Sequence, residues 1–184
     1  MIEYNLHKCY LLCVKFDGIF LTFWFLNIKF LELKLIKDRS DEKRQLYLSG
    51  DFLLPRISPN ISDNFFDPLD DRLGEYFKYL NDIQTIGSET KVFPCHDWPF
   101  KDGSERAKNL IKHHNHRLKL ILDELKNRSI TIMDSIEIIF DRKIGDEQMH
   151  FAIGEARAHL IHLDVTGQAK SEMDDKGTVH YSCL

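Results

Sequence analysis

The pattern of apolar and polar residues changes several times along the chain, and each change predicts a different element. Apolar residues alternate with polar ones at 31–35 and again at 45–49, with the polar segment 37–44 between them. This arrangement predicts two antiparallel strands joined by a turn. A third short strand is predicted at 90–93. Residues 1–30 are dense in aromatic and β-branched side chains, which favour strands, but they show no clear period.

Later in the chain, apolar residues recur at the spacing of an amphipathic helix. The four predicted helices cover residues 70–83, 102–127, 132–140 and 147–164. Thr131 is suited to cap the third helix, and Gly167 is suited to end the fourth. After Gly167, the polar turn 174–177 separates two short strands, 168–172 and 178–181, which predicts a β-hairpin.

Composition and charge narrow the class of protein. Hydrophobic residues make up 43% of the 184 and charged residues 29%, as in an ordinary globular protein. A net charge of -4 gives no general attraction to nucleic acid or to an anionic membrane. The four cysteines show no paired spacing, which is typical of the reducing cytoplasm.

The apolar segment 10–36 is not predicted to be a membrane anchor. Its longest uncharged run, 18–28, has 11 residues, whereas a spanning helix needs about 20. No small-residue cleavage site follows the run, so a signal peptide is not predicted either. We therefore expect a cytoplasmic protein without a membrane segment.

Two predicted strands are each followed by a side chain of a type that binds metal ions. Asp51 follows the strand at 45–49, after the flexible Gly50, and His96 follows the strand at 90–93. Two strand ends that present a carboxylate and an imidazole suggest part of a metal site. A carboxylate in this position can equally accept hydrogen bonds from backbone amides.

The sequence around these residues resembles the C-terminal part of metallo-β-lactamase-fold hydrolases that end in a small winged-helix domain. Ser49-Gly50-Asp51 resembles the family segment that provides a bridging aspartate. Pro94-Cys95-His96 resembles the Pro-Gly-His segment that provides a late histidine. The flanking segments 53–60, 73–76 and 113–117 are similar as well. The resemblance implies bound metal, usually zinc, at Asp51 and His96, and hydrolysis of a small-molecule ester, thioester, lactone or phosphodiester.

The chain departs from the family pattern in its ligands. It has no HxHxDH motif, and no histidine lies between His7 and His96. Cys95 and Asp97 stand where the family usually has glycines. A zinc site needs three or four protein ligands, and Asp51 and His96 supply two. We therefore expect a truncated form that is impaired in metal binding and catalysis.

The expected organisation has three parts. Residues 1–30 form an apolar segment that does not match the family, 31–128 form the C-terminal half of a metallo-β-lactamase-like α/β domain, and 129–184 form a winged-helix-like α+β domain. The predicted helix at 147–164 carries few basic residues, so nucleic acid is not an expected partner. Two alternatives stay open, a non-catalytic module that contacts protein or RNA and a truncated product without independent function. Homo-oligomerisation also stays open.

The remaining histidines are interpreted as structural. On the helix predicted at 102–127, His114 falls on the buried stripe, whereas His113 and His116 are expected at the surface without a carboxylate or thiol beside them. His159 and His162, on the helix predicted at 147–164, are expected to be surface or packing residues.

Overall fold

A computed structural model describes residues 12–16, 19–23, 40–41, 45–62 and 70–184. Its packing divides the chain into two units, 1–40 and 41–184. In the first unit, β1 (Leu12–Phe16) and β2 (Ile19–Phe23) form an antiparallel pair. The strand predicted at 31–35 lies outside the described residues, as does most of the segment 1–30.

The second unit contains β4 (Leu46–Gly50) and β5 (Lys91–Pro94), which belong to a sheet with the strand order β3-β4-β5; the two-residue strand β3 (Ser40–Asp41) falls at the boundary between the units. β4 and β5 are parallel, and the helix α2 (Arg72–Ile83) lies between them in sequence. Parallel strands end at the same edge of a sheet. The residues that follow β4 and β5 therefore meet at one edge, and the predicted mixed α/β fold is confirmed.

Gly50 turns the chain at the end of β4. Its φ of 55° lies in the left-handed region, which glycine enters without a steric penalty. The strand register shifts between Leu48 and Gly50, and the Gly50 carbonyl accepts a hydrogen bond of 2.9 Å from the Cys95 amide. This irregular end ties the segment after β4 to the segment after β5.

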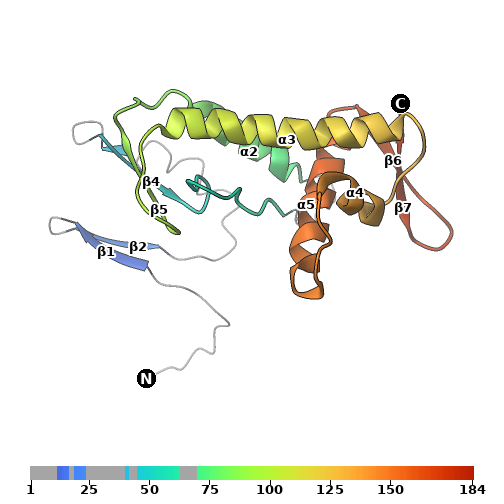
Figure 1. Ribbon diagram of the computed structural model, residues 1–184, viewed down its shortest axis with the longest axis horizontal. Helices are drawn as coiled ribbons and strands as arrows, with labels where there is room; N and C mark the ends of the chain where they lie inside the picture. The colour runs from blue at the N-terminus through green and yellow to red at the C-terminus, as the bar shows by residue number, and fades with distance from the viewer. Residues whose placement is uncertain (1–11, 17–18, 24–39, 42–44, 63–69) are drawn as a thin grey trace, which may run out of the picture. The chain divides into compact units, whose positions relative to one another are not determined.

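The longest helix, α3 (Gly103–Leu125), runs from the β5 side of the unit towards the C-terminal hairpin (Figure 1). The buried residues of α3 follow the predicted helical spacing and include Ala107, Leu110, His114, Leu118, Ile121 and Leu125. At its start, a β-carbon on Gly103 would lie 2.8 Å from Val92 Cγ2, so the helix approaches β5 closely. None of the described helices has the length and apolar character needed to cross a lipid bilayer.

The C-terminal elements follow the predicted order of helix, helix and hairpin. They are α4 (Ile132–Ile139), α5 (Asp146–Val165), β6 (Ala169–Met173) and β7 (Val179–Cys183). Gly167, with a φ of 68°, follows α5 as predicted. The backbone of Ile130 pairs with that of Tyr181 through two hydrogen bonds of 2.8 and 2.9 Å, which attaches the start of this region to the hairpin. The domain boundary predicted at 128/129 falls inside the second unit, between α3 and α4.

The start of α4 gives a first testable prediction, because Thr131 and Asp134 form a capping box. Hydrogen bonds from the side chain and backbone of Thr131, with help from Arg128, lower the pKa of Asp134 to about 2. We expect Asp134→Ala to reduce the free energy of unfolding by about 1 kcal/mol at pH 7. Urea denaturation of the variant and the native chain measures this difference.

The pH dependence of this difference identifies its origin. A carboxyl group whose pKa is depressed by folding stabilises the fold above its unfolded pKa, here 3.8, and loses that effect as the pH falls towards about 2. The native chain and Asp134→Ala should therefore converge in stability between these pH values. Asp175→Ala, at an exposed turn residue, is the control. A stability difference that does not change with pH would show that the ionised carboxylate is not its cause.

Candidate metal site at the edge of the sheet

Asp51 and His96 lie together at the edge of the sheet, directly after β4 and β5. His96 Nε2 is 3.3 Å from Asp51 Oδ1. The Asp51 side chain is 49% exposed and that of His96 is 71% exposed, but the Oδ1 atom itself is shielded from solvent and has no hydrogen-bond partner. The two atoms are thus close without a hydrogen bond of ordinary geometry between them. An acceptor oxygen in this situation is suited to a cation.

The distance between these two atoms fits a shared metal ion. Zinc binds carboxylate oxygen and imidazole nitrogen at about 2.0–2.2 Å, and tetrahedral geometry places two such ligands about 3.3–3.5 Å apart. The separation in the structure, 3.3 Å, falls in that range. Among the described residues, no third histidine, cysteine, aspartate or glutamate completes a group of three with them. Asp51 and His96 therefore fit as two ligands of a metal site that needs further ones.

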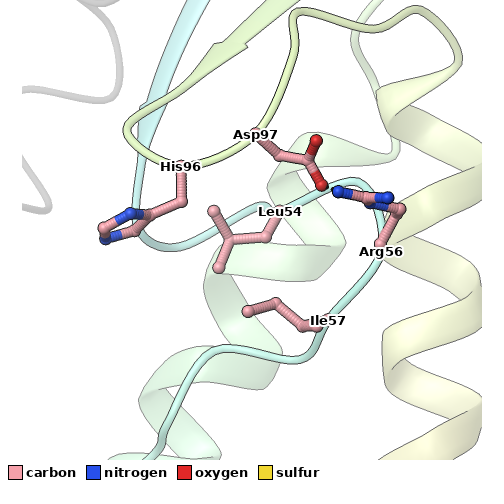
Figure 2. Close-up of a pocket in the computed structure, with 5 residues that line it drawn as sticks. All are labelled: Leu54, Arg56, Ile57, His96 and Asp97. Carbon is pink, nitrogen blue, oxygen red and sulfur yellow. Dashed lines mark hydrogen bonds and ion pairs between the residues drawn. The ribbon is translucent and has the colours of Figure 1, made fainter.

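Asp97 follows His96 in an unusual backbone conformation. Its φ of 73° lies in the left-handed region that glycine adopts most easily, which agrees with its position where the resemblance places a glycine. Its carboxylate accepts hydrogen bonds from Arg56 Nε and from the Trp98 amide, and the Arg56 contact lowers the pKa of Asp97. Figure 2 shows the Asp97 and Arg56 side chains pointing towards each other, so this carboxylate is engaged away from the imidazole of His96.

A pocket of about 260 Å³ opens beside His96. Its lining residues are Leu54, Arg56, Ile57, His96 and Asp97 (Figure 2). Leu54 is buried beneath it, whereas Ile57 is 62% exposed. The pocket thus places two apolar side chains and one ion pair next to a candidate metal ligand.

Side chains from α2 and α3 hold the loop that carries this pocket. Arg106, on α3, donates hydrogen bonds of 2.7 Å to the Leu54 carbonyl and 2.9 Å to the Ile57 carbonyl. Tyr76, on α2, donates through its hydroxyl to the Phe52 carbonyl at 2.9 Å. Burial raises the pKa of Tyr76 above its ordinary value, so this donor keeps its proton. The sequence did not predict this role for either residue.

A second group of metal-binding side chains lies between α3 and α5. One ligand atom from each of His113, His114 and Glu155 lies within 4.8 Å of the others. The sequence predicts no carboxylate beside His113 and His116, and this is wrong for His113, because Glu155 reaches it from α5. His114 is fully buried and His116 exposed, as predicted, but His113 is only partly exposed. His159 is fully buried, and His162 Nδ1 lies 3.0 Å from the Asp71 carboxylate.

Comparison with known families gives a match for the C-terminal part of the chain. Residues 118–184 match the family described as "Metallo-beta-lactamase-like, C-terminal domain". This segment includes the end of α3 and all of the elements from α4 to β7. A search of curated proteins gives no significant match.

Solved structures extend the similarity over most of the chain. A beta-lactamase domain protein from Burkholderia ambifaria is similar with 32% identity and a TM-score of 0.75 over 78% of this chain. A metallo-beta-lactamase family protein from Thermus thermophilus is similar with 25% identity and a TM-score of 0.65, also over 78% of this chain. In each case the similarity covers 43% of the other protein, so this chain spans less than half of their length.

Proposed function

We propose that this chain provides the C-terminal part of a metal-dependent hydrolase of the metallo-β-lactamase type, with Asp51 and His96 as two of its metal ligands. The observation that carries the proposal is the contact of 3.3 Å between Asp51 Oδ1 and His96 Nε2, in which the shielded oxygen has no hydrogen-bond partner. The family match of residues 118–184 and the similarity to two metallo-β-lactamase-type structures support the proposed type of hydrolase.

The two side chains have distinct tasks in this proposal. Asp51 supplies a negative charge and an oxygen ligand from the end of β4, and His96 supplies a neutral nitrogen ligand from the end of β5. A divalent ion such as zinc, held by Asp51 and His96, would supply Lewis-acid chemistry that activates water near neutral pH. The short tie between Gly50 and Cys95 keeps the two ligands in register.

The neighbouring pocket is the proposed position of the substrate. Leu54 and Ile57 can contact an apolar group and exclude water from it, whereas the Arg56–Asp97 pair closes one side. We assign the substrate to the ester, thioester, lactone or phosphodiester class. We further propose that residues 129–184 fold as a winged-helix-like unit that serves as a wall of the substrate site or as a subunit contact.

The proposal is tested with zinc and with hydrolase substrates. His113→Gln serves as the starting protein, so that the second group of ligands does not contribute. We expect zinc affinity, measured by calorimetry, to fall about tenfold, or ~1.4 kcal/mol, in each of Asp51→Asn and His96→Gln. With excess zinc, we expect weak hydrolysis of at least one of a thioester, a lactone and a short RNA, because a site with two described ligands binds metal loosely.

The chain contains a matched control for these substitutions. His180 and Asp174 form another exposed histidine–aspartate pair, with a contact of 3.1 Å on the C-terminal hairpin. His180→Gln should leave both zinc affinity and hydrolysis unchanged. Hydrolysis that survives Asp51→Asn and His96→Gln, or no hydrolysis at saturating zinc, would contradict the proposed function.

A further inference from the structure

A buried group of polar side chains joins α3 to α5, away from the sheet-edge site. His113 and His114 come from α3, and Glu155 and His159 come from α5. His114 and His159 are fully buried, and Glu155 is 8% exposed. It is unusual for three buried ionisable side chains to lie next to one another, because a buried polar group reduces stability unless it has a hydrogen-bond partner.

The hydrogen bonds of this group determine where its protons are. Both His114 and His159 are fully buried, and burial in a nonpolar environment favours the neutral form of an imidazole ring. His159 Nδ1 lies 2.7 Å from the Glu155 carbonyl, which can only accept, so this nitrogen carries the ring proton. His159 Nε2 is then an acceptor, and His114 Nδ1 donates a hydrogen bond to it across 3.2 Å.

This chain of donors leaves His114 Nε2 with an unused lone pair. That nitrogen is buried and has no hydrogen-bond partner among the described residues, and the same holds for His113 Nε2. The ring of His113 lies against the ring of His114, with centroids 5.1 Å apart. A histidine that donates from Nδ1 to a fixed acceptor and presents a bare Nε2 has the arrangement found in metal-ligating histidines.

Glu155 adds a carboxylate to the two imidazoles. One of its oxygens accepts a hydrogen bond from Arg117, and a carboxylate has a second oxygen with which to bind a cation. The positive charge of Arg117 would repel a cation bound beside Glu155, but the negative charge of the Glu155 carboxylate offsets this repulsion. The available ligands are two neutral imidazoles and one carboxylate. Zinc is bound by such a set of three protein ligands in sites where its fourth coordination position stays open. Mg²⁺ and Ca²⁺ prefer oxygen ligands alone.

We propose that His113, His114 and Glu155 bind a divalent zinc-type ion that links α3 to α5. The site is separate from Asp51 and His96, and it does not depend on the proposed hydrolase function. Its effect is structural, because the ion would satisfy two buried nitrogen atoms that have no other partner and would fix the contact between the long helix and the C-terminal region.

The experiment uses the full chain with Asp51→Asn and His96→Gln, so that the sheet-edge ligands are absent. Cobalt(II) is the probe, since its visible absorption reports nitrogen and oxygen coordination, and zinc is then used in thermal unfolding. We expect one cobalt ion to bind per chain and zinc to raise the unfolding temperature, because an ion that binds only the folded state stabilises it.

Further substitutions in this protein test the assigned ligands. His113→Gln and Glu155→Gln should each weaken cobalt binding by about tenfold or more, since even residues behind the ligands have effects of that size. His116→Gln, at an exposed position of the same helix, should change nothing. Absence of cobalt binding to the folded starting protein, or binding unchanged by both substitutions, would overturn the proposal. If one of His113→Gln and Glu155→Gln fails to fold, cobalt binding to the other variant decides the result. If both fail, His113→Asn is used instead, and the proposal predicts that zinc no longer raises its unfolding temperature.

Discussion

Arg117→Met is expected to reduce the free energy of unfolding by about 3–5 kcal/mol, because it leaves the buried carboxylate of Glu155 without its partner. The side chains of Arg117 and Glu155 are each 11% exposed, and the guanidinium donates a hydrogen bond to the carboxylate. Burial raises the pKa of Glu155, and the charge of Arg117 opposes that effect. The guanidinium also lies 4.8 Å from the centre of the Phe140 ring. Methionine keeps the apolar part of these contacts and removes the charge.

Urea denaturation in the presence of a chelator measures this effect without bound metal. Arg128→Met is the matched control, because Arg128 also pairs with two carboxylates, Glu124 and Asp134, but its side chain is 50% exposed. Exposed pairs contribute about 0–1 kcal/mol, so this variant should be only slightly destabilised. The double variant Arg117→Met/Glu155→Met should regain most of the lost stability. Equal effects of Arg117→Met and Arg128→Met would show that the buried pair has no special role.

The helices were predictable because their signal is local. Apolar spacing and the capping residue Thr131 lie within one segment, so the predicted helix 132–140 and the observed α4 (Ile132–Ile139) nearly coincide. Strand pairing lacks such a signal. The sequence predicts that the strand at 45–49 pairs with 31–35, which lies outside the described residues, and it does not reveal the parallel pairing of β4 with β5. That pairing joins residues about 45 positions apart, with α2 between them in sequence, so no local pattern indicates it.

In the candidate site, too, residues with a local sequence signal could be predicted, whereas residues that depend on distant contacts could not. Asp51 and His96 stood out because each follows a short strand, and the structure brings them together. Arg106 could not be identified in this way, because its bond to the Leu54 carbonyl joins residues 52 positions apart. Glu155 was missed for the same reason, since its proximity to His114 depends on how α5 crosses α3. The left-handed conformation of Asp97 had one signal, the glycine that the family resemblance places there.

Leu160→Ala is expected to reduce the free energy of unfolding by about 2–5 kcal/mol, because Leu160 is fully buried on α5 and its truncation leaves a cavity. The separate unit that the sequence predicts from residue 129 stays a prediction; in the structure, residues 41–184 belong to one compact unit. Contacts such as that between His162, on α5, and Asp71, at the start of α2, connect the two regions. We therefore expect the substitution to destabilise α2 as well as α5.

Native-state hydrogen exchange separates these two possibilities, because it reports the opening of each segment individually. In Leu160→Ala, the slowest amides of α2 and of α5 should lose protection by similar amounts if 41–184 unfolds as one unit. Faster exchange in α5 with unchanged exchange in α2 would instead establish the independent terminal domain. Met133→Ala is the control, since Met133 is 53% exposed on α4 and its truncation should change stability by less than about 0.5 kcal/mol. A cooperative unit would mean that mutations in the C-terminal helices also alter the sheet edge that carries Asp51 and His96.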